Sequence, residues 1–170
     1  MAIQEKEQFD NFLKDPATAQ QKAKDDAEIN AYLKANNINA IQSPLGIFIQ
    51  KLSPGNGQKA KAGDYMMLRY TGKDLTGKIF DSNNKPDGQL MPYQVGAGGM
   101  IPGFSNGLKD LTEGEKAIIY IPSVFGYGAQ GNPQAAIAPN QSLIFEIEVV
   151  DISDKAPAPP TPPVPDSTRK

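Results

Sequence analysis

Short segments with alternating apolar and polar residues dominate the chain from residue 43 onward, and they limit the folds open to it. Residues 143–152 read LIFEIEVVDI and residues 65–71 read YMMLRYT, and residues 115–121 form another expected strand. A period of two is typical of a strand with one buried face. Turns rich in Gly and Pro, such as SPGNG at residues 53–57, separate the segments.

One short segment among these strands has helical spacing instead. Phe104, Leu108 and Leu111 recur at that spacing within residues 103–111. Further short strands are expected at residues 46–52, 78–81 and 91–95. Because strands and long helices do not alternate, the pattern predicts an α+β fold in which an antiparallel sheet carries one short helix on one face.

The two ends differ in composition from this middle part. Residues 19–36 are rich in helix formers without Gly or Pro, and Asp15 before Pro16 is typical of a helix start. Residues 155–170 hold six of the fifteen prolines, which indicates a disordered, polyproline-like tail. The expected organisation is a helical extension over residues 1–42, a domain over residues 43–154 and a disordered tail over residues 155–170.

The apolar stripe of the N-terminal helix is thin. Ile29, Tyr32 and Leu33 lie on it beside Ala and Lys residues. Such a stripe predicts a helix that packs loosely on the domain or against a partner. We expect a monomer, with a dimer through this helix as the alternative, and we expect removal of residues 1–40 to spare the chemistry of the downstream domain.

The composition excludes several classes of chemistry. The chain has no Cys and no His, which excludes disulfides, Ser-His-Asp or Cys-His nucleophiles and the usual zinc, copper and haem sites. Gly96–Gly99 lacks the Lys and Ser/Thr of a phosphate loop. The net charge of -2 favours neither nucleic acid nor an anionic membrane, and no run approaches the ~20 apolar residues of a membrane span. We expect no cofactor and no metal.

The sequence leaves the cellular compartment open. A chain without thiols is indifferent to redox conditions, and the first ten residues, MAIQEKEQFD, lack the basic-then-apolar pattern of a signal peptide. The periplasm or cell envelope is expected if a signal has been removed, and the cytoplasm otherwise.

Four segments in a fixed order carry the strongest functional signal. They are RYTG at residues 69–72, GKIFDS at residues 77–82, YQVG at residues 93–96 with MIPGF at residues 100–104, and FGYGA at residues 125–129 with IAPN at residues 137–140 and LIFEIE at residues 143–148. Each alone can occur by chance. The ordered set, with its spacing, resembles the FKBP family of peptidyl-prolyl cis-trans isomerases.

The resemblance implies a sheet wrapped around helix 103–111, with a shallow apolar pocket between them. It implies proline-containing polypeptides as substrates and macrolide inhibitors as candidate ligands. The catalytic candidates that match the family motifs are Tyr70, Asp81, Ile101 and Tyr127. The residues expected to bind the substrate are Phe80, Tyr93, Met100, Phe104, Ile137 and Phe145.

The expected reaction needs no nucleophile, acid or metal. Rotation about an Xaa-Pro bond has a barrier of about 18–20 kcal/mol because amide resonance is broken. The twisted amide is less polar than the planar one, so an apolar pocket that excludes water stabilises it. The resemblance implies that the Ile101 N–H and the Tyr127 hydroxyl hold peptide carbonyls, and that Asp81 accepts a hydrogen bond from Tyr70.

Two other functions fit the same residues. A non-catalytic peptide-binding or chaperone module is the main alternative, since a fold does not guarantee an activity. A scaffold whose Pro-rich tail recruits a partner with an aromatic groove is the second. Taken singly, aromatic residues at strand spacing are more often core than pocket. The order of the motifs favours an active isomerase that assists the folding of client proteins.

Overall fold

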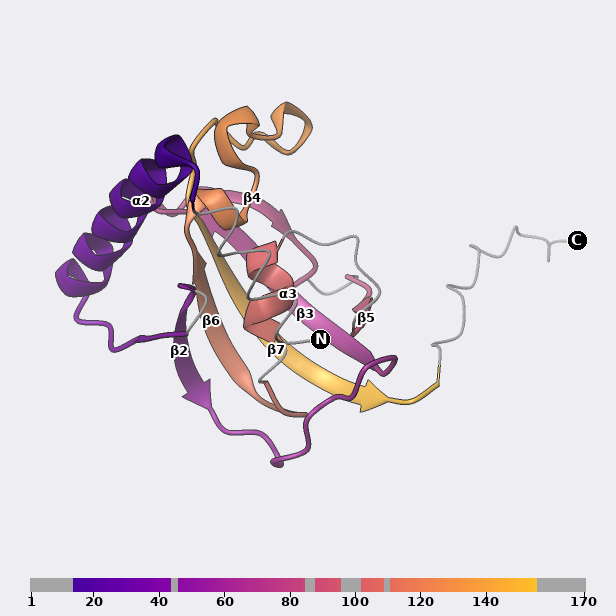
Figure 1. Cartoon of the computed structure of the whole chain (residues 1–170). Coiled ribbons are helices and arrows are strands. Elements are labelled where there is room, and N and C mark those ends of the chain that lie inside the picture. The colour runs from indigo at the N-terminus through magenta and orange to yellow at the C-terminus, as the bar shows by residue number, and fades with distance from the viewer. Residues whose placement is uncertain (1–13, 44–45, 85–87, 96–101, 109–110, 156–170) are drawn as a thin grey trace, which may run out of the picture.

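A computed structural model of the chain describes residues 14–43, 46–84, 88–95, 102–108 and 111–155 (Figure 1). The expected tail lies outside the described residues except for Lys155, and so do residues 1–13 of the helical extension. Within the described residues, no helix is both long enough and apolar enough to cross a membrane.

One antiparallel sheet of seven strands forms the centre of the described structure. From one edge to the other its strands are β1 (Ile41–Gln42), β2 (Phe48–Ser53), β6 (Lys116–Ile121), β7 (Leu143–Ser153), β3 (Tyr65–Asp74) and β4 (Ile79–Ser82), and β5 (Met91–Gln94) also pairs with β3. The long central pair, β3 and β7, stays in contact from Tyr65 opposite Ser153 to Asp74 opposite Leu143. The predicted strands are therefore present.

The short helix α3 (Pro102–Leu108) lies against one face of this sheet, which curls around it (Figure 1). Phe104 and Leu108 are buried in the main core. Two glycines allow close contact with β6, because a Cβ on Gly107 would lie 2.5 Å from Ile119 Cδ1 and one on Gly103 would overlap Ile121. Leu111, the last residue of the expected helix, lies outside the described helix but is still fully buried.

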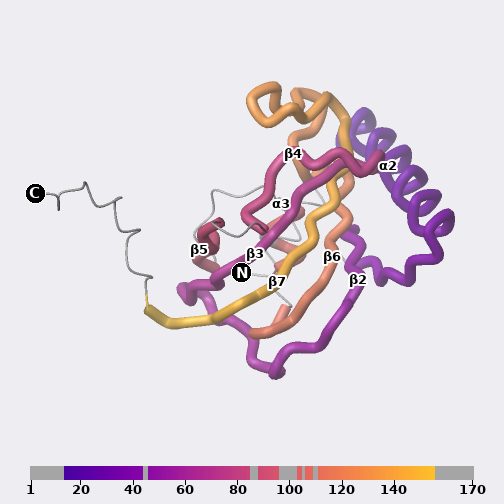
Figure 2. The backbone as a smooth tube through the Cα atoms, turned by 180° about the vertical axis from the view of Figure 1, so that it is seen from behind, coloured from indigo at the N-terminus to yellow at the C-terminus, as the bar shows by residue number. Residues whose placement is uncertain are grey.

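The long helix α2 (Pro16–Ala35) lies along the opposite face of the sheet (Figure 2). It begins as predicted: Thr18 N–H donates to the Asp15 carboxylate at 3.0 Å, and Pro16 follows the cap. Ile29 and Leu33 are buried in a second apolar cluster formed with the sheet residues Phe48, Tyr120 and Ile144. The sheet buries Ile29 and Leu33 and half-buries Tyr32, so the helix packs on its own domain more closely than the thin stripe led us to expect.

Strand β7 shows why this contact forms. Leu143, Phe145 and Ile147 face the main core, as their alternation predicts, but Ile144 on the other face is also only 1% exposed. Ile144 pairs with Tyr120 in the register of β6 and β7, and both contact the α2 cluster. The sheet is therefore buried on both faces at this end.

Three short 3-10 helices connect β6 to β7 and form the lobe at the top of Figure 1. They are η1 (Ser123–Phe125), η2 (Gly128–Gln130) and η3 (Pro133–Ala135). An isolated bridge between Asn132 and Ile137 closes the last turn of the lobe. This segment carries Tyr127 and Ile137, two of the candidate site residues.

Candidate functional site

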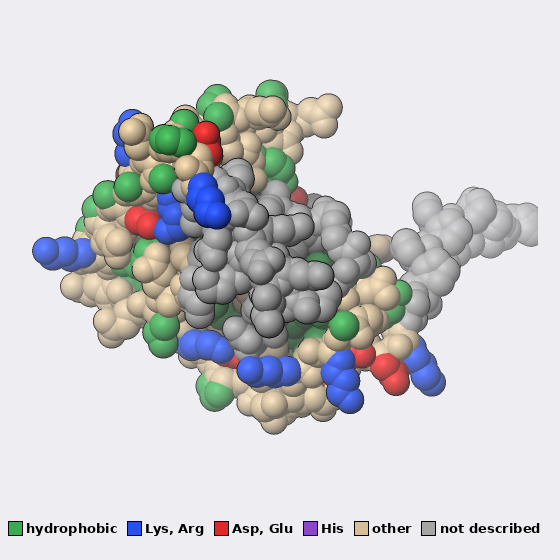
Figure 3. Space-filling model, viewed as in Figure 1, with side chains coloured by type: hydrophobic (Ala, Val, Ile, Leu, Met, Phe, Trp, Pro, Cys, Tyr) green, Lys and Arg blue, Asp and Glu red, His purple; other side chains and the backbone are tan. Residues whose placement is uncertain are grey.

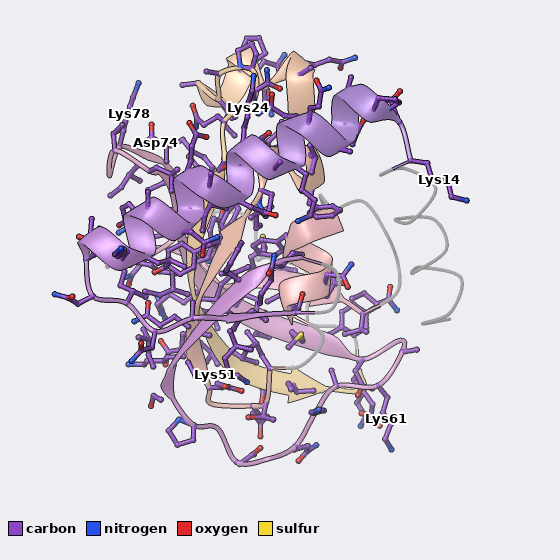
Figure 4. The ribbon with its side chains drawn as sticks, turned by 60° about the vertical axis from the view of Figure 1, so that its left-hand side comes forward. Lys14, Lys24, Lys51, Lys61, Asp74 and Lys78 are labelled. Carbon is purple, nitrogen blue, oxygen red and sulfur yellow. The ribbon has the colours of Figure 1, made fainter. Side chains whose placement is uncertain are left out.

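The β3–β4 hairpin fixes the polar part of the site. At its tip, Asp74 Oδ1 accepts hydrogen bonds from the backbone N–H groups of Thr76 at 2.9 Å and Lys78 at 3.1 Å, and Figure 4 shows Asp74 and Lys78 side by side. Burial raises the pKa of Asp74, but a hydrogen bond from the Thr76 hydroxyl, the two backbone hydrogen bonds and the charge of Lys78 outweigh it and hold the pKa below its ordinary value. The carboxylate thus keeps the tight turn closed.

The strand register beyond this turn brings two candidate catalytic residues together. Gly72 lies opposite Asp81, so the side chains of Tyr70 and Asp81 reach each other across the hairpin. The Tyr70 hydroxyl donates to Asp81 Oδ2 at 2.8 Å. The pair therefore consists of a phenol donor and a carboxylate acceptor that are set by the pairing of β3 and β4.

Asn83 supports this pair, and the sequence reading did not single it out. Its Oδ1 accepts from Tyr70 N–H at 2.7 Å, and its Nδ2 donates to the carbonyls of Leu68 at 2.9 Å and Gln89 at 3.0 Å. Between the end of β4 and the start of β5, the Asn83 side chain thereby makes the hydrogen bonds to the β3 backbone that a neighbouring strand would otherwise make. An Asn in a polar loop gives little signal, because its partners are distant backbone groups.

Phe145 is the centre of an aromatic wall beside the Tyr70–Asp81 pair. Its ring meets that of Phe104 edge to face with centroids 4.9 Å apart, and that of Phe80 edge to face at 5.7 Å. The Tyr70 ring is tilted against it at 6.5 Å. Edge-to-face contacts are a favoured geometry for aromatic rings, so the four rings support one another.

Gly72 makes room for this wall. A Cβ at this position would lie 2.8 Å from Phe145 Cε1 and 2.8 Å from Phe80 Cζ. Contacts this short do not occur for real Cβ atoms, so any other residue would displace one of the two rings. The glycine of the RYTG motif is therefore required by the packing of the wall.

The wall has a buried floor and a more exposed rim. Phe104 is 2% exposed, and Tyr93, Ile137 and Phe145 are also buried. Tyr70, Phe80 and Tyr127 are half-buried and pack against the same cluster. Eight of the ten candidate residues thus belong to or adjoin one apolar cluster, whereas Met100 and Ile101 lie outside the described residues.

Burial and charge keep the Tyr70 phenol protonated. The pKa of Tyr70 is raised to about 12, chiefly by burial. The hydrogen bond to Asp81, the negative charge of Asp81 and the nearby Tyr127 phenol raise it further. Tyr70 therefore remains a hydrogen-bond donor at neutral pH. The effect of Tyr127 also shows that the lobe between β6 and β7 approaches the hairpin.

Charged groups are dispersed around this side of the molecule. In Figure 3, Lys and Arg side chains lie along the edge of the described surface with acidic side chains among them. Within the described residues, no group of three or more acidic side chains is placed to hold a metal ion. The chemistry available at the wall is therefore apolar contact and hydrogen bonding from the rim.

The described architecture is therefore an α+β scaffold in which a sheet curls around one short helix, with an aromatic wall and a Tyr–Asp pair at its rim. The chain belongs to the FKBP-type peptidyl-prolyl cis-trans isomerase family, whose model matches residues 56–150. The family and enzyme class predicted from the ordered motifs are confirmed.

Relatives from fungi and bacteria carry the same assignment. FK506-binding protein 1A of Aspergillus fumigatus is 38% identical over 115 residues, covering 65% of this chain and 98% of the relative. The FKBP-type peptidyl-prolyl cis-trans isomerase FkpA of Escherichia coli is 33% identical over 128 residues. That match covers 75% of this chain but only 44% of the relative.

Solved structures confirm the predicted FKBP-like fold. The crystal structure of FkpA from Escherichia coli matches with a TM-score of 0.65 and 29% identity over 93% of this chain and 73% of that chain. A peptidyl-prolyl cis-trans isomerase from Pseudomonas syringae matches with a TM-score of 0.62 and 30% identity over 75% of this chain and 91% of that chain.

Proposed function

We propose that this chain accelerates rotation about Xaa-Pro bonds in client polypeptides and so assists their folding. The observation that carries the proposal is the wall of Phe80, Phe104 and Phe145 beside the Tyr70–Asp81 hydrogen bond, in a chain of an isomerase family. Uncatalysed Xaa-Pro isomerisation takes about 10–100 s, slow enough to limit folding. We place the activity in residues 43–154.

The proposed mechanism is non-covalent stabilisation of a twisted amide. The prolyl ring packs against Phe104 and Phe145, which removes water from the bond that rotates. In this environment the planar, more polar amide loses more solvation than the twisted amide, so the barrier falls. Each reduction of about 1.4 kcal/mol in the barrier gives a tenfold gain in rate.

The rim residues hold the peptide on either side of that bond. The Tyr127 hydroxyl donates to a peptide carbonyl from the lobe, and the Ile101 backbone N–H donates to another, a role assigned to Ile101 by resemblance alone. Asp81 holds the Tyr70 ring in the wall through their 2.8 Å hydrogen bond and places a negative charge at its edge. Phe80, Tyr93, Met100 and Ile137 complete the apolar surface around the prolyl ring.

Macrolide binding to the same surface is part of the proposal. Fungal relatives that match this chain are named FK506-binding proteins. A large apolar ring system that replaces the prolyl group would cover the same aromatic wall. FK506 should therefore compete with a proline peptide for this site, and the inhibition should be competitive in the peptide.

The test is a protease-coupled isomerase assay on a proline-containing tetrapeptide with the full chain. We expect acceleration over buffer, and modest losses of kcat/KM in Asp81→Asn and in Tyr127→Phe, because the rate depends on the whole wall rather than one proton donor. Asp154→Asn and Tyr32→Phe are matched controls at residues outside the wall and should retain the wild-type rate. A folded chain that binds the peptide without accelerating its isomerisation would instead establish the non-catalytic module.

A further inference from the structure

A fully buried carboxylate on α2 is bonded to the lobe that carries Tyr127. Asp25 has no exposed surface, and its Oδ2 accepts a hydrogen bond from Ser123 Oγ at 2.6 Å and from Val124 N–H at 3.3 Å. Its Oδ1 accepts from Gln21 Nε2 at 2.8 Å. The helix of the N-terminal extension thus contacts η1 directly, although Ser123 follows Asp25 by 98 positions in the sequence.

The hydrogen bonds of Asp25 restrain the position of η1 more narrowly than apolar packing would. Asp25 lies one helical turn before Ile29 and two before Leu33, on the face of α2 that covers the sheet. Burying a carboxylate is unfavourable unless hydrogen bonds satisfy it, and its bonds are directional. An apolar side chain at position 25 would hold the helix in place, whereas Asp25 also fixes where η1 lies relative to it.

The lobe transmits that placement to Tyr127 over a short and rigid path. Phe125 N–H bonds to the Pro122 carbonyl and Gly126 N–H to the Ser123 carbonyl, each at 2.9 Å. Phe125 is 1% exposed within the cluster of the aromatic wall. Tyr127 follows two residues later, so Asp25 anchors one end of the segment and the core anchors its middle.

We propose that Asp25 is a positioning residue of the isomerase, which sets the place of the Tyr127 hydroxyl through Ser123 and Val124. This inference rests on the proposed role of Tyr127 in holding the substrate. It makes α2 a part of the working active site, contrary to the sequence-based expectation that the chemistry is independent of residues 1–40. The helix then acts on the reaction from the face of the sheet opposite the aromatic wall.

The first arm of the test measures kcat/KM in the full chain with the protease-coupled assay. Ser123→Ala removes the donor of the Ser123–Asp25 hydrogen bond, and Asp25→Asn weakens the bond by removing the charge of its acceptor. Each should lower kcat/KM by about fivefold, since small displacements of a binding group are costly in rate. Asp26→Asn is the matched control, because the carboxylate of the neighbouring Asp26 pairs with Lys22 at 2.6 Å on the same helix, whereas that of Asp25 is bonded to Ser123. It should retain the wild-type rate.

The second arm asks whether the effect passes through Tyr127. The double variant Asp25→Asn/Tyr127→Phe should be no slower than Tyr127→Phe alone, because residues that act through one another are not additive. In parallel, amide hydrogen exchange of Val124, Gly126 and Gly131 should accelerate in Asp25→Asn and in Ser123→Ala but not in Asp26→Asn. If Asp25→Asn does not fold, Ser123→Ala carries both arms, since it leaves Asp25 bonded to Gln21 and Val124.

The outcomes separate the inference from the function on which it rests. If amide hydrogen exchange in the lobe, or kcat/KM, is unchanged in Asp25→Asn and Ser123→Ala, the positioning role of Asp25 is refuted. The proposed role of Tyr127 is then unaffected. A full additional loss in the double variant would do the same, because Asp25 would then act elsewhere. A wild-type rate for Tyr127→Phe alone would refute the role of Tyr127, and with it the inference.

Discussion

The Tyr70 hydroxyl donates a hydrogen bond to Asp81 across 2.8 Å, from the central strand β3 to the edge strand β4. The bond depends on a turn closed by Asp74 and on the side chain of Asn83, which occupies the gap beyond β4. It joins the aromatic wall to a carboxylate at its rim. The electrostatic state of the site is therefore set by this pair.

Burial of Tyr70, together with its hydrogen bond to Asp81, makes stability depend on pH in the alkaline range. The pKa of Tyr70 in the folded chain is raised to about 12, while an unfolded Tyr titrates near about 10. Between these values the unfolded chain binds fewer protons than the folded one, so the free energy of unfolding falls as pH rises from about 10 to about 12. Urea unfolding across this interval measures the fall.

Two variants identify the residues that cause this fall in the free energy of unfolding. Tyr70→Phe should reduce this loss of stability, and most of the remaining loss should come from Tyr120. Burial, followed by the charges of Tyr32 and Glu146, also raises the pKa of Tyr120 to about 12. Asp81→Asn should lower the pKa of Tyr70 in a phenolate titration but keep it above the ordinary value, because burial persists. A Tyr70 titration unchanged by Asp81→Asn would contradict the contribution assigned to the carboxylate.

Phe104→Ala should weaken both the fold and the reaction. Loss of a buried Phe typically costs about 3–5 kcal/mol, and here it also removes the edge-to-face partner of Phe145. Chemical unfolding measures the first effect and kcat/KM, at a temperature where the variant is folded, the second. Phe48→Ala is the comparison, since Phe48 is also buried but packs against α2 on the other face; it should lose stability but lose less of its rate than Phe104→Ala.

Gly72→Ala should disturb the wall without changing its chemistry. The added methyl group would lie 2.8 Å from both Phe80 and Phe145, and overpacking of this kind costs about 1–3 kcal/mol. We expect a lower melting temperature and a lower kcat/KM. Adding Phe80→Ala to the same chain should recover part of the stability lost to the methyl group, and a double variant that is merely additive would contradict the steric explanation.

Ile29→Ala should show that α2 is held by the sheet of its own chain. Ile29 is fully buried, and removing such a side chain costs about 2–5 kcal/mol. Ile41→Ala is the matched control, because Ile41 is 73% exposed and its loss should change the free energy of unfolding by less than about 0.5 kcal/mol. Equal effects of the two substitutions would indicate that α2 does not stabilise the sheet.

The sequence predicted the elements whose signals are local. The strand at residues 143–152 alternates in hydrophobicity, Phe104 and Leu108 have helical spacing, and Asp15–Pro16 begins α2 as expected. The motif order also brought together side chains that the structure places in one cluster. These features were predictable because each depends on neighbours within a few residues or on a pattern shared by a whole family.

The features that sequence reading missed depend on contacts between distant parts of the chain. Ile144 looks like an outward-facing residue of β7 until α2 covers it. Asp25 looks like one of several exposed charges on a polar helix, and its burial follows only from its contact with Ser123. Asn83 serves backbone groups of another strand. No local pattern distinguishes these residues from solvated ones.

The docking of α2 also has a consequence for the time course of synthesis. The helix leaves the ribosome before every strand of the sheet, yet its partners Tyr120, Ser123 and Ile144 come near the end of the chain. A lone helix of this length is marginal in water. The helix, although made before the sheet, is thus among the last elements to be packed, because β6 and β7 must first form the surface that it contacts.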